Sequence, residues 1–327
     1  MRLKDDTGKM SSHRLSVERI EEASRLIDPA FLNSPQFEAE SLSRRYGVRT
    51  YLKVETVNPI RSFKGRGADY FVAKLPATMK RLACASAGNF GQGLGYAARK
   101  YGIGLDVFAS VNANPLKLEA IRAFGACVHM TGHDFDAAKA AGRAYAAREG
   151  IMFVEDGKEP EISEGAGTIG LELCRLSARL DAVLIPLGNG ALIGGVARWM
   201  RHASPSTKII GVCAAAAPSM EQSWNRRFVI ETATAMTIAD GIGVRVPIPE
   251  AVDDTLTLVD QVVLVGDRAM VRAQNVAFRE LGLMVESSGA AGLAALRLCA
   301  SALKGLSVAI VLTGGNVSAA DRKRMLF

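Results

Sequence analysis

Short apolar runs alternate with helix-like segments along most of the chain, and this alternation constrains the fold more than any other feature. The runs RLACAS (81–86), LDVFASV (105–111) and DAVLIPL (181–187) each precede a segment with the spacing of an amphipathic helix. Two further runs, KIIGVCA (208–214) and SVAIVLT (307–313), are apolar without alternation, as expected of strands buried on both faces. The pattern predicts an α/β protein with mostly parallel sheets flanked by helices.

The composition excludes several classes of protein. The 327 residues are 49% hydrophobic and 22% charged, which is typical of a globular chain with a substantial core. No uncharged apolar run reaches the roughly 18 residues of a membrane span, and the N-terminus lacks the apolar core of a signal peptide. We therefore predict a cytoplasmic protein with no membrane partner. The charge of +7 is modest, and no basic run interleaved with aromatic residues indicates nucleic acid as a partner.

The five cysteines are odd in number, widely scattered and without the CxxC spacing of zinc or redox sites. They indicate neither a disulfide framework nor a metal site. We predict that all five are reduced residues of the core: Cys84, Cys127, Cys174, Cys213 and Cys299.

Each predicted strand ends in a loop rich in Gly, Asn or Ser, and in open α/β sheets ligands bind outside the carboxyl ends of the strands. The loop NPIRSFKGRGADYF (58–71) places Lys64 between an aromatic residue and two glycines. By itself, Lys64 is compatible with a solvated surface charge, a phosphate-binding group or a covalent catalyst. Two other loops provide the amide of Asn89, at a predicted helix start, and the neutral hydroxyl of Thr313.

The segment IPLGNGALIGG (185–195) is a strand, a glycine-rich turn and a helix start. The backbone N–H groups of such a turn and the helix dipole form a site suited to phosphate. The segment lacks the GK[ST] of a Walker A loop and the GxGxxG spacing of a dinucleotide fold, which disfavours ATP and NAD. A lysine, a phosphate cradle, an amide and a hydroxyl together fit pyridoxal phosphate, whose aldehyde needs an amine.

The motifs in these loops resemble those of the fold-type II pyridoxal phosphate enzymes, most of all the threonine/serine dehydratase and serine racemase group. From about Leu15 to Val317, seven segments occur in the family's order and at about its spacing: SFKGRGA, SAGNFGQG, GAGTIGLEL, PLGNGALIGG, TIADGIGV, the ESSGA segment that begins at Glu286, and TGGNV. The resemblance implies a two-domain enzyme similar to the tryptophan synthase β chain, each domain an open, mostly parallel sheet flanked by helices. Residues 1–75 and 156–327 would form the large cofactor-binding domain, and residues 76–155 a small mobile domain.

The resemblance also implies a site for pyridoxal 5'-phosphate. Lys64 matches the family lysine that binds the cofactor covalently and then acts as base on the substrate α-carbon, with Phe63 packed behind the ring. Asn89 matches the residue that bonds the ring 3-oxygen, and Glu286 either lies near the ring or is only a helix N-terminal carboxylate. Thr313 faces the pyridine nitrogen, and its hydroxyl, which does not enforce a protonated ring, suits β-elimination better than transamination. The phosphate would bind Gly188, Asn189, Gly190, Ala191 and Leu192, where Asn189 and Ala191 depart from the family's GGGGL.

The substrate side of the site is implied by the same motifs. Ser86, Ala87, Gly88 and Asn89 would line the site for the substrate carboxylate, and Gly241 would lie near the substrate face. Phe90 stands where the family has a histidine, so that either it borders the pocket and favours a larger apolar substrate, or it only packs the small domain. The family's metal-binding glutamate aligns with an alanine in the run 214–217, so no metal site is expected.

The departures from the family pattern also discriminate between reactions. Serine racemase has a serine, the acid/base of the opposite face, where this chain has Ala87, whereas the dehydratases have alanine there. We therefore predict β-elimination of a β-hydroxyamino acid such as threonine or serine to a 2-oxo acid and ammonia. Another fold-type II reaction, β-replacement or racemisation, is the alternative, and cofactor binding without catalysis is a further one. The expected partners are an amino acid substrate and copies of the chain in a homodimer or homotetramer.

Overall fold

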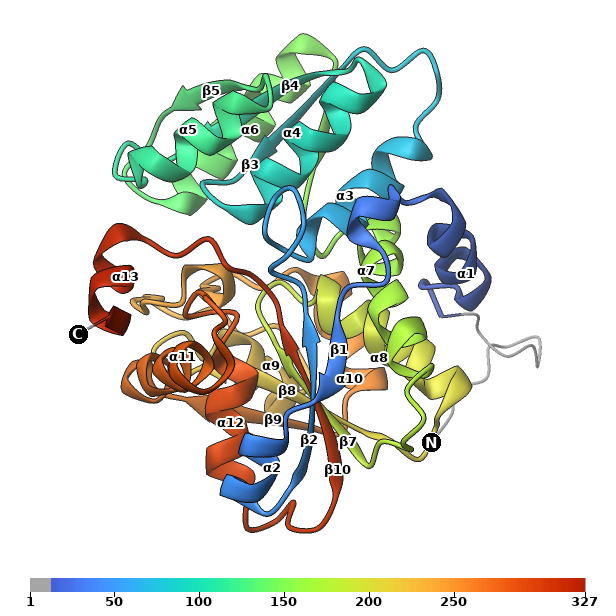
Figure 1. Ribbon diagram of the computed structural model, residues 1–327. Helices are drawn as coiled ribbons and strands as arrows, with labels where there is room; N and C mark the ends of the chain where they lie inside the picture. Colours follow the sequence, from blue (N-terminus) through green and yellow to red (C-terminus); the bar gives the residue numbers. More distant parts are fainter. Residues whose placement is uncertain (1–12, 327) are drawn as a thin grey trace.

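The computed structural model describes residues 13–326 and contains two β-sheets with helices packed on them (Figure 1). The larger sheet has six strands, in the spatial order β1 (Gln36–Glu38), β2 (Arg49–Val54), β10 (Ser307–Leu312), β7 (Ala182–Pro186), β8 (Lys208–Ala214) and β9 (Gln261–Val265). All of its neighbouring strands are parallel except the edge pair β1 and β2. The predicted α/β class is confirmed.

The smaller sheet has four parallel strands, in the order β5 (Cys127–Met130), β4 (Gly104–Ala109), β3 (Arg81–Ala85) and β6 (Met152–Val154). Three helices stand with it at the top of Figure 1: α4 (Asn89–Tyr101), α5 (Pro115–Ala123) and α6 (Phe135–Glu149). Every strand and helix of this group lies between residues 81 and 154. The domain boundaries and the mobility of the small domain stay predictions, and the chain ends assigned to the large domain, 1–12 and 327, lie outside the described residues.

The other α-helices lie outside the smaller sheet's group, and those that pack on the larger sheet cover both of its faces. These other helices are α1 (Val17–Leu26), α2 (Glu40–Tyr46), α3 (Lys64–Ala73), α7 (Pro160–Leu173), α8 (Ala191–Ala203), α9 (Ser219–Arg226), α10 (Pro249–Leu258), α11 (Asp267–Leu281), α12 (Ala291–Cys299) and α13 (Ala319–Leu326). In β7, Leu184 packs into the core formed with α11 and α12, whereas its neighbours Val183 and Ile185 pack into the core formed with α7 and α8. Because both faces of the strand are buried, its sequence is apolar without alternation.

Close helix packing explains the segment GAGTIGLEL, which lies in α7. A Cβ added at Gly165 would lie 2.6 Å from the carbonyl oxygen of Arg66 in α3, nearer than any real Cβ contact. A Cβ at Gly170 would lie 2.9 Å from the carbonyl oxygen of Val196 in α8. These glycines therefore let α7 approach both helices that begin at the predicted cofactor loops, and a structural role accounts for them.

All five cysteines are free, but they are not all in the core. Cys84 and Cys213 are buried, Cys299 is partly exposed, and Cys127 and Cys174 are exposed. The prediction of core cysteines was therefore wrong for the last two, because Cys127 begins the edge strand β5 and Cys174 follows the last residue of α7. Within the described range, the helices are too short or too polar for any of them to cross a membrane.

Candidate active site

A cavity of about 590 Å³ contains every residue that the sequence assigned to the site. Its wall includes Phe63, Lys64, Ser86, Ala87, Gly88, Asn89, Phe90, Gly188, Asn189, Gly190, Ala191, Leu192, Gly241, Glu286 and Thr313. These residues come from segments that follow β2, β3, β7 and β10 and from two loops of the C-terminal half. The structure thus brings the predicted residues together, and the role of each stays a prediction.

Lys64 is the first residue of α3, and two contacts with the segment after β10 fix its position. Ser62 and Gly314 form an antiparallel β-bridge, and the N–H of Phe63 donates to the carbonyl oxygen of Thr313 over 3.0 Å. The Lys64 side chain is 14% exposed, and its Nζ lies 4.6 Å from the centroid of the Phe63 ring. The backbone before Lys64 is therefore held beside Thr313, and the Lys64 amine lies at the cavity wall.

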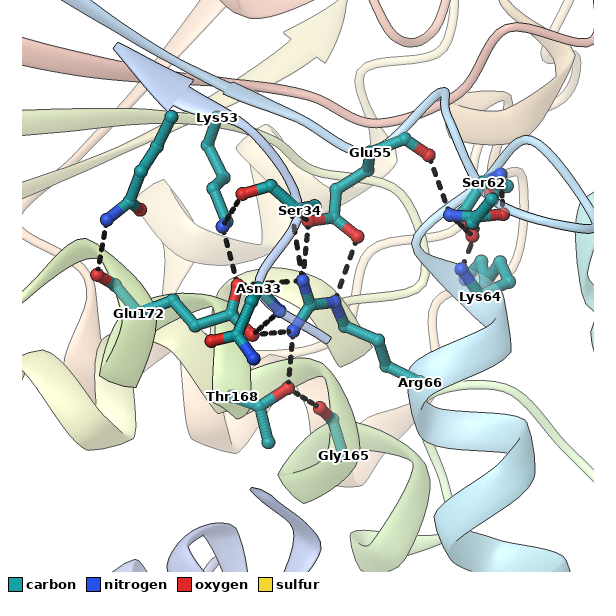
Figure 2. Close-up of polar contacts among 12 residues, drawn as sticks. Asn33, Ser34, Lys53, Glu55, Ser62, Lys64, Arg66, Gly165, Thr168 and Glu172 are labelled. Carbon is teal, nitrogen blue, oxygen red and sulfur yellow. Dashed lines mark hydrogen bonds and ion pairs between the residues drawn. The ribbon is translucent and has the colours of Figure 1, made fainter. Parts of the chain in front are cut away.

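A buried ionic network anchors the first turn of α3 two residues after Lys64 (Figure 2). The guanidinium of Arg66, which is fully buried, pairs with both oxygens of Glu55 at 2.8 and 2.9 Å and both oxygens of Glu172 at 2.7 and 2.9 Å. The Nζ of Lys53 lies 2.5 Å from Glu172 as well. Two cations and two carboxylates therefore join β2, α3 and α7 with no net formal charge.

The pKa values in this network follow from its burial and pairing. Burial alone would raise the pKa of Glu172, but hydrogen bonds and charge from Arg66 and Lys53 hold it below its usual value. Burial lowers the pKa of Lys53 in spite of the neighbouring carboxylates. Because each ion has its charge balanced in a place closed to water, the loss of one partner would leave a buried uncompensated charge.

The turn from β7 to α8 has the backbone geometry of an anion site. Gly190 is left-handed with φ +87°, and a Cβ there would lie 2.8 Å from the Cβ of Ala251. Asn189 and Ala191, the two departures from the family's glycines, are not among the described non-glycine residues with positive φ, so neither carries a left-handed strain. Within the described part of the chain, no hydrogen bond is donated by the backbone N–H groups of residues 188–191.

Asn89 and Glu286 form a polar pair in the cavity wall. The Nδ2 of Asn89 donates to Glu286 Oε1 over 2.6 Å, and its Oδ1 accepts from Asn316 Nδ2 at 2.8 Å. Burial, followed by the charge of Asp240, raises the pKa of Glu286 to about 7. The sequence did not indicate Asn316, although it lies in the TGGNV segment.

The loop before α4 is held by its own serine. The N–H groups of Gly88 and Gly91 donate to Ser86 Oγ over 3.2 and 2.9 Å. A Cβ at Gly88 would meet no atom within 4 Å, so the loop presents bare backbone to open space. Phe90 belongs to the core of the smaller sheet, yet its ring centroid lies 5.9 Å from Lys64 Nζ, and both interpretations of this residue therefore stay open.

Charged groups that the sequence analysis missed also line the cavity. Asp156 Oδ2 lies 2.5 Å from Lys64 Nζ, just after β6. Lys117 pairs with Asp240, and these two residues come from α5 and from the loop before α10. The missed strand β6 has only three residues, and a recognised strand there would have marked Asp156 as a loop residue at a carboxyl end.

Arg245 and Asp136 form a second ion pair, 2.5 Å long, that resembles the Lys117–Asp240 pair in its placement. In each pair one residue lies on a helix of the smaller sheet's group, Lys117 on α5 and Asp136 on α6. The other residue of each pair comes after β8 in the chain. The two ion pairs therefore connect the smaller sheet's helices with the larger sheet's loops at the cavity wall.

A comparison with known proteins identifies the family. The model of the pyridoxal-phosphate dependent enzyme family matches residues 27–314. The chain belongs to this family. The L-threonine ammonia-lyase of Geobacter sulfurreducens is 35% identical over 301 residues, which cover 91% of this chain and 75% of that protein. The chloroplastic biosynthetic threonine dehydratase of Arabidopsis thaliana is 34% identical over 292 residues, which cover 88% of this chain but 49% of the relative, so this chain spans about half its length.

Solved structures agree with this placement. Threonine deaminase isoform 2 from Solanum lycopersicum, in its processed form, superposes with a TM-score of 0.87 at 28% identity, covering 95% of this chain and 93% of that one. Maize serine racemase superposes with a TM-score of 0.89 at 26% identity, covering 95% and 97%. The predicted fold, the threonine/serine dehydratase and serine racemase group, and pyridoxal phosphate as cofactor are confirmed.

The residues present fit that cofactor. Pyridoxal phosphate needs an amine, several hydrogen-bond donors for its phosphate, and partners for its ring oxygen and nitrogen. The cavity provides the Lys64 amine, the free backbone N–H groups of the turn before α8, the Asn89 amide and the Thr313 hydroxyl, in the order of these needs. The turn itself, Gly188 to Leu192, contributes no charged side chain to the wall.

One possible metal-ligand group lies away from the cavity. Asp106, Cys127 and His129 each offer a ligand atom, and these atoms lie within 4.8 Å of one another. The Nε of Arg81 already pairs with Asp106 Oδ2 at 2.6 Å, which opposes a cation at that carboxylate. The absence of a metal at the alanine run 214–217, whose residues are not part of the cavity wall, stays a prediction.

Proposed function

We propose that the protein is a pyridoxal phosphate-dependent ammonia-lyase that converts a β-hydroxyamino acid such as threonine or serine to a 2-oxo acid and ammonia. The observation that carries this proposal is that the Lys64 amine shares one cavity with the turn 188–191, whose backbone N–H groups donate no hydrogen bond to any described residue. Relatives named L-threonine ammonia-lyase and threonine dehydratase support the same reaction class.

When bound, pyridoxal phosphate withdraws electrons from the substrate α-carbon and makes its hydrogen acidic. Lys64 Nζ holds the cofactor and then takes the α-proton, since it is the amine at the start of α3 that points into the cavity. The bare backbone of residues 86–89 binds the substrate carboxylate. The α-proton and the β-hydroxyl are lost together as one water, and a second water hydrolyses the resulting enamine to the 2-oxo acid and ammonia.

Ala87 favours elimination over racemisation. Racemisation needs a proton donor on the substrate face opposite Lys64, and the methyl side chain of Ala87 has no proton to give. The similarity to maize serine racemase extends over the fold, and the residue that would distinguish the two reactions is this alanine. β-Replacement, which needs a second substrate, is separated from elimination by an assay with one amino acid alone.

Assembly and location are further proposals. We infer that the chain forms a homodimer or homotetramer in the cytoplasm and binds no partner besides its amino acid substrate. Exposed apolar side chains such as Val57, 61% exposed, and Leu298, 63% exposed, are candidates for burial between copies. Analytical ultracentrifugation at several concentrations would measure the assembly, and a monomer at all of them would refute it.

The test of the reaction uses purified protein with cofactor and one amino acid at a time. We expect 2-oxo acid and ammonia in equal amounts from L-threonine or L-serine, and none from Lys64→Ala. Lys74→Ala is the matched control, because Lys74 ends the same helix and its side chain is 38% exposed. Interconversion of L- and D-serine faster than 2-oxo acid formation would contradict the proposal.

A further inference from the structure

We propose that Asp156 selects the substrate by its side chain, favouring a β-substituent that donates a hydrogen bond or carries a positive charge and rejecting an anionic one. The inference rests on the proposed function, because it concerns the substrate that would bind in the same cavity, next to the cofactor held by Lys64. It adds a specificity-determining carboxylate to the part of the cavity where the substrate side chain would lie.

The position of Asp156 carries the proposal. The side chain is 11% exposed, and its Oδ2 lies 2.5 Å from Lys64 Nζ. Its other oxygen, Oδ1, is buried and accepts no hydrogen bond from any group of residues 13–326. A buried carboxylate oxygen without a donor is costly, so a ligand group in the cavity that donates to Asp156 would stabilise this carboxylate.

Cofactor binding increases this deficit. With the cofactor held by Lys64, Nζ would no longer be a free ammonium facing Asp156. A substrate whose amino group takes the place of Nζ would enter the same part of the cavity. The substrate α-carbon and its side chain therefore come close to the place that Nζ occupies, within reach of the carboxylate.

The other cations of the cavity wall do not compensate Asp156. Each of them already pairs with a carboxylate of the wall: Lys117 with Asp240, Lys139 with Glu155, and Arg245 with Asp136. An anionic side chain would thus meet Asp156 with no unpaired cation among the described wall residues to receive it. A hydroxyl or an ammonium, in contrast, satisfies the Asp156 carboxylate directly.

The substitution Asp156→Asn tests the proposal, because it removes the charge and keeps the size. We would measure dissociation constants from the change in cofactor absorbance for three amino acids that differ in the group on the β-carbon: L-serine, L-2,3-diaminopropionate and L-aspartate. The parent should bind serine and diaminopropionate at least tenfold more tightly than aspartate. In Asp156→Asn the preference for diaminopropionate over aspartate should fall at least tenfold.

Asp134→Asn is the matched control. Asp134 also lines the cavity, but its Oδ1 accepts the N–H of Ala137 at the start of α6, a bond that asparagine can keep. Its preference ratio should equal that of the parent. Circular dichroism checks that each variant is folded, and Asp156→Ser, which also lacks the charge, provides the same test if the asparagine variant is not.

The outcomes separate this inference from the proposed function. If the parent binds the amino acids and the folded Asp156 variants keep its preference ratio, the role of Asp156 is overturned while the function stands. If the parent shows no absorbance change and forms no 2-oxo acid, the proposed function fails and the inference fails with it. A ratio that falls in the Asp156 variants and not in Asp134→Asn supports the inference.

Discussion

Substitution of Arg66 by methionine should strongly destabilise the protein. Methionine keeps much of the side-chain length but removes a guanidinium that is 0% exposed and donates to both oxygens of Glu55 and of Glu172. The cluster in Figure 2 would change from no net charge to −1, with Lys53 as its remaining cation. Removing one partner of a buried ion pair costs about 3–5 kcal/mol, and we expect a loss of unfolding free energy in this range.

The assay is equilibrium unfolding in guanidinium chloride, followed by circular dichroism on parent and variant. The control is Arg44→Met, which removes an exposed pair with Glu40 and should cost about 0.3–0.5 kcal/mol. The double variant with Glu172→Gln should lose less than the sum of the single losses, because glutamine removes a charge that Arg66→Met leaves unpaired. A loss of unfolding free energy below about 1 kcal/mol for Arg66→Met would contradict a costly buried ion network, since it would equal the loss from an exposed surface pair.

Three further predictions concern the cavity. The pKa of Glu286 is raised to about 7, so its proton binds more tightly in the folded state than in the unfolded state. The unfolding free energy of the cofactor-free parent should therefore fall between pH 5 and 8 relative to that of Glu286→Gln, by an amount on the order of 3 kcal/mol. Equal pH profiles of the two proteins would contradict this prediction. Phe90→His should lower kcat/KM for a β-hydroxyamino acid larger than threonine, relative to kcat/KM for threonine, about fourfold per methylene that the ring buries. If the ratio of these two values is the same in parent and variant, Phe90 has a structural role only. Ala87→Ser should raise serine racemisation relative to elimination, measured by chiral chromatography, and no rise would remove Ala87 as the discriminating residue.

Apolar runs predicted the central strands because strands buried on both faces leave a continuous signal. The run SVAIVLT corresponds to β10, whose six residues are all buried, and RLACAS corresponds to β3. Three edge strands, β1, β6 and β9, were missed for the opposite reason, whereas the edge strand β5 lies in the run ACVHMT, which the sequence also indicates as a strand. β1 and β6 have three residues each, too few for a periodic pattern, and β9 at the other edge has partly exposed residues.

The site residues were accessible from the sequence because each lies in a loop after a strand or in a motif that resembles the family's. Asp156 was not, since its loop follows a strand that the sequence did not indicate. The network of Arg66, Glu55 and Glu172 could not be predicted either. Glu55 follows β2, Arg66 lies on α3 and Glu172 lies on α7, and only the packing of these three elements brings the two glutamates to one guanidinium.

Borohydride reduction tests directly whether Lys64 binds pyridoxal phosphate in this cavity. The reagent makes the bond between cofactor and lysine permanent, so that digestion and mass spectrometry identify the modified residue. We expect a protein that absorbs visible light, loses this absorbance on reduction and carries the label on Lys64, within the segment SFKGRGA. A label on any other lysine, or a purified protein that takes up no cofactor, would contradict this expectation.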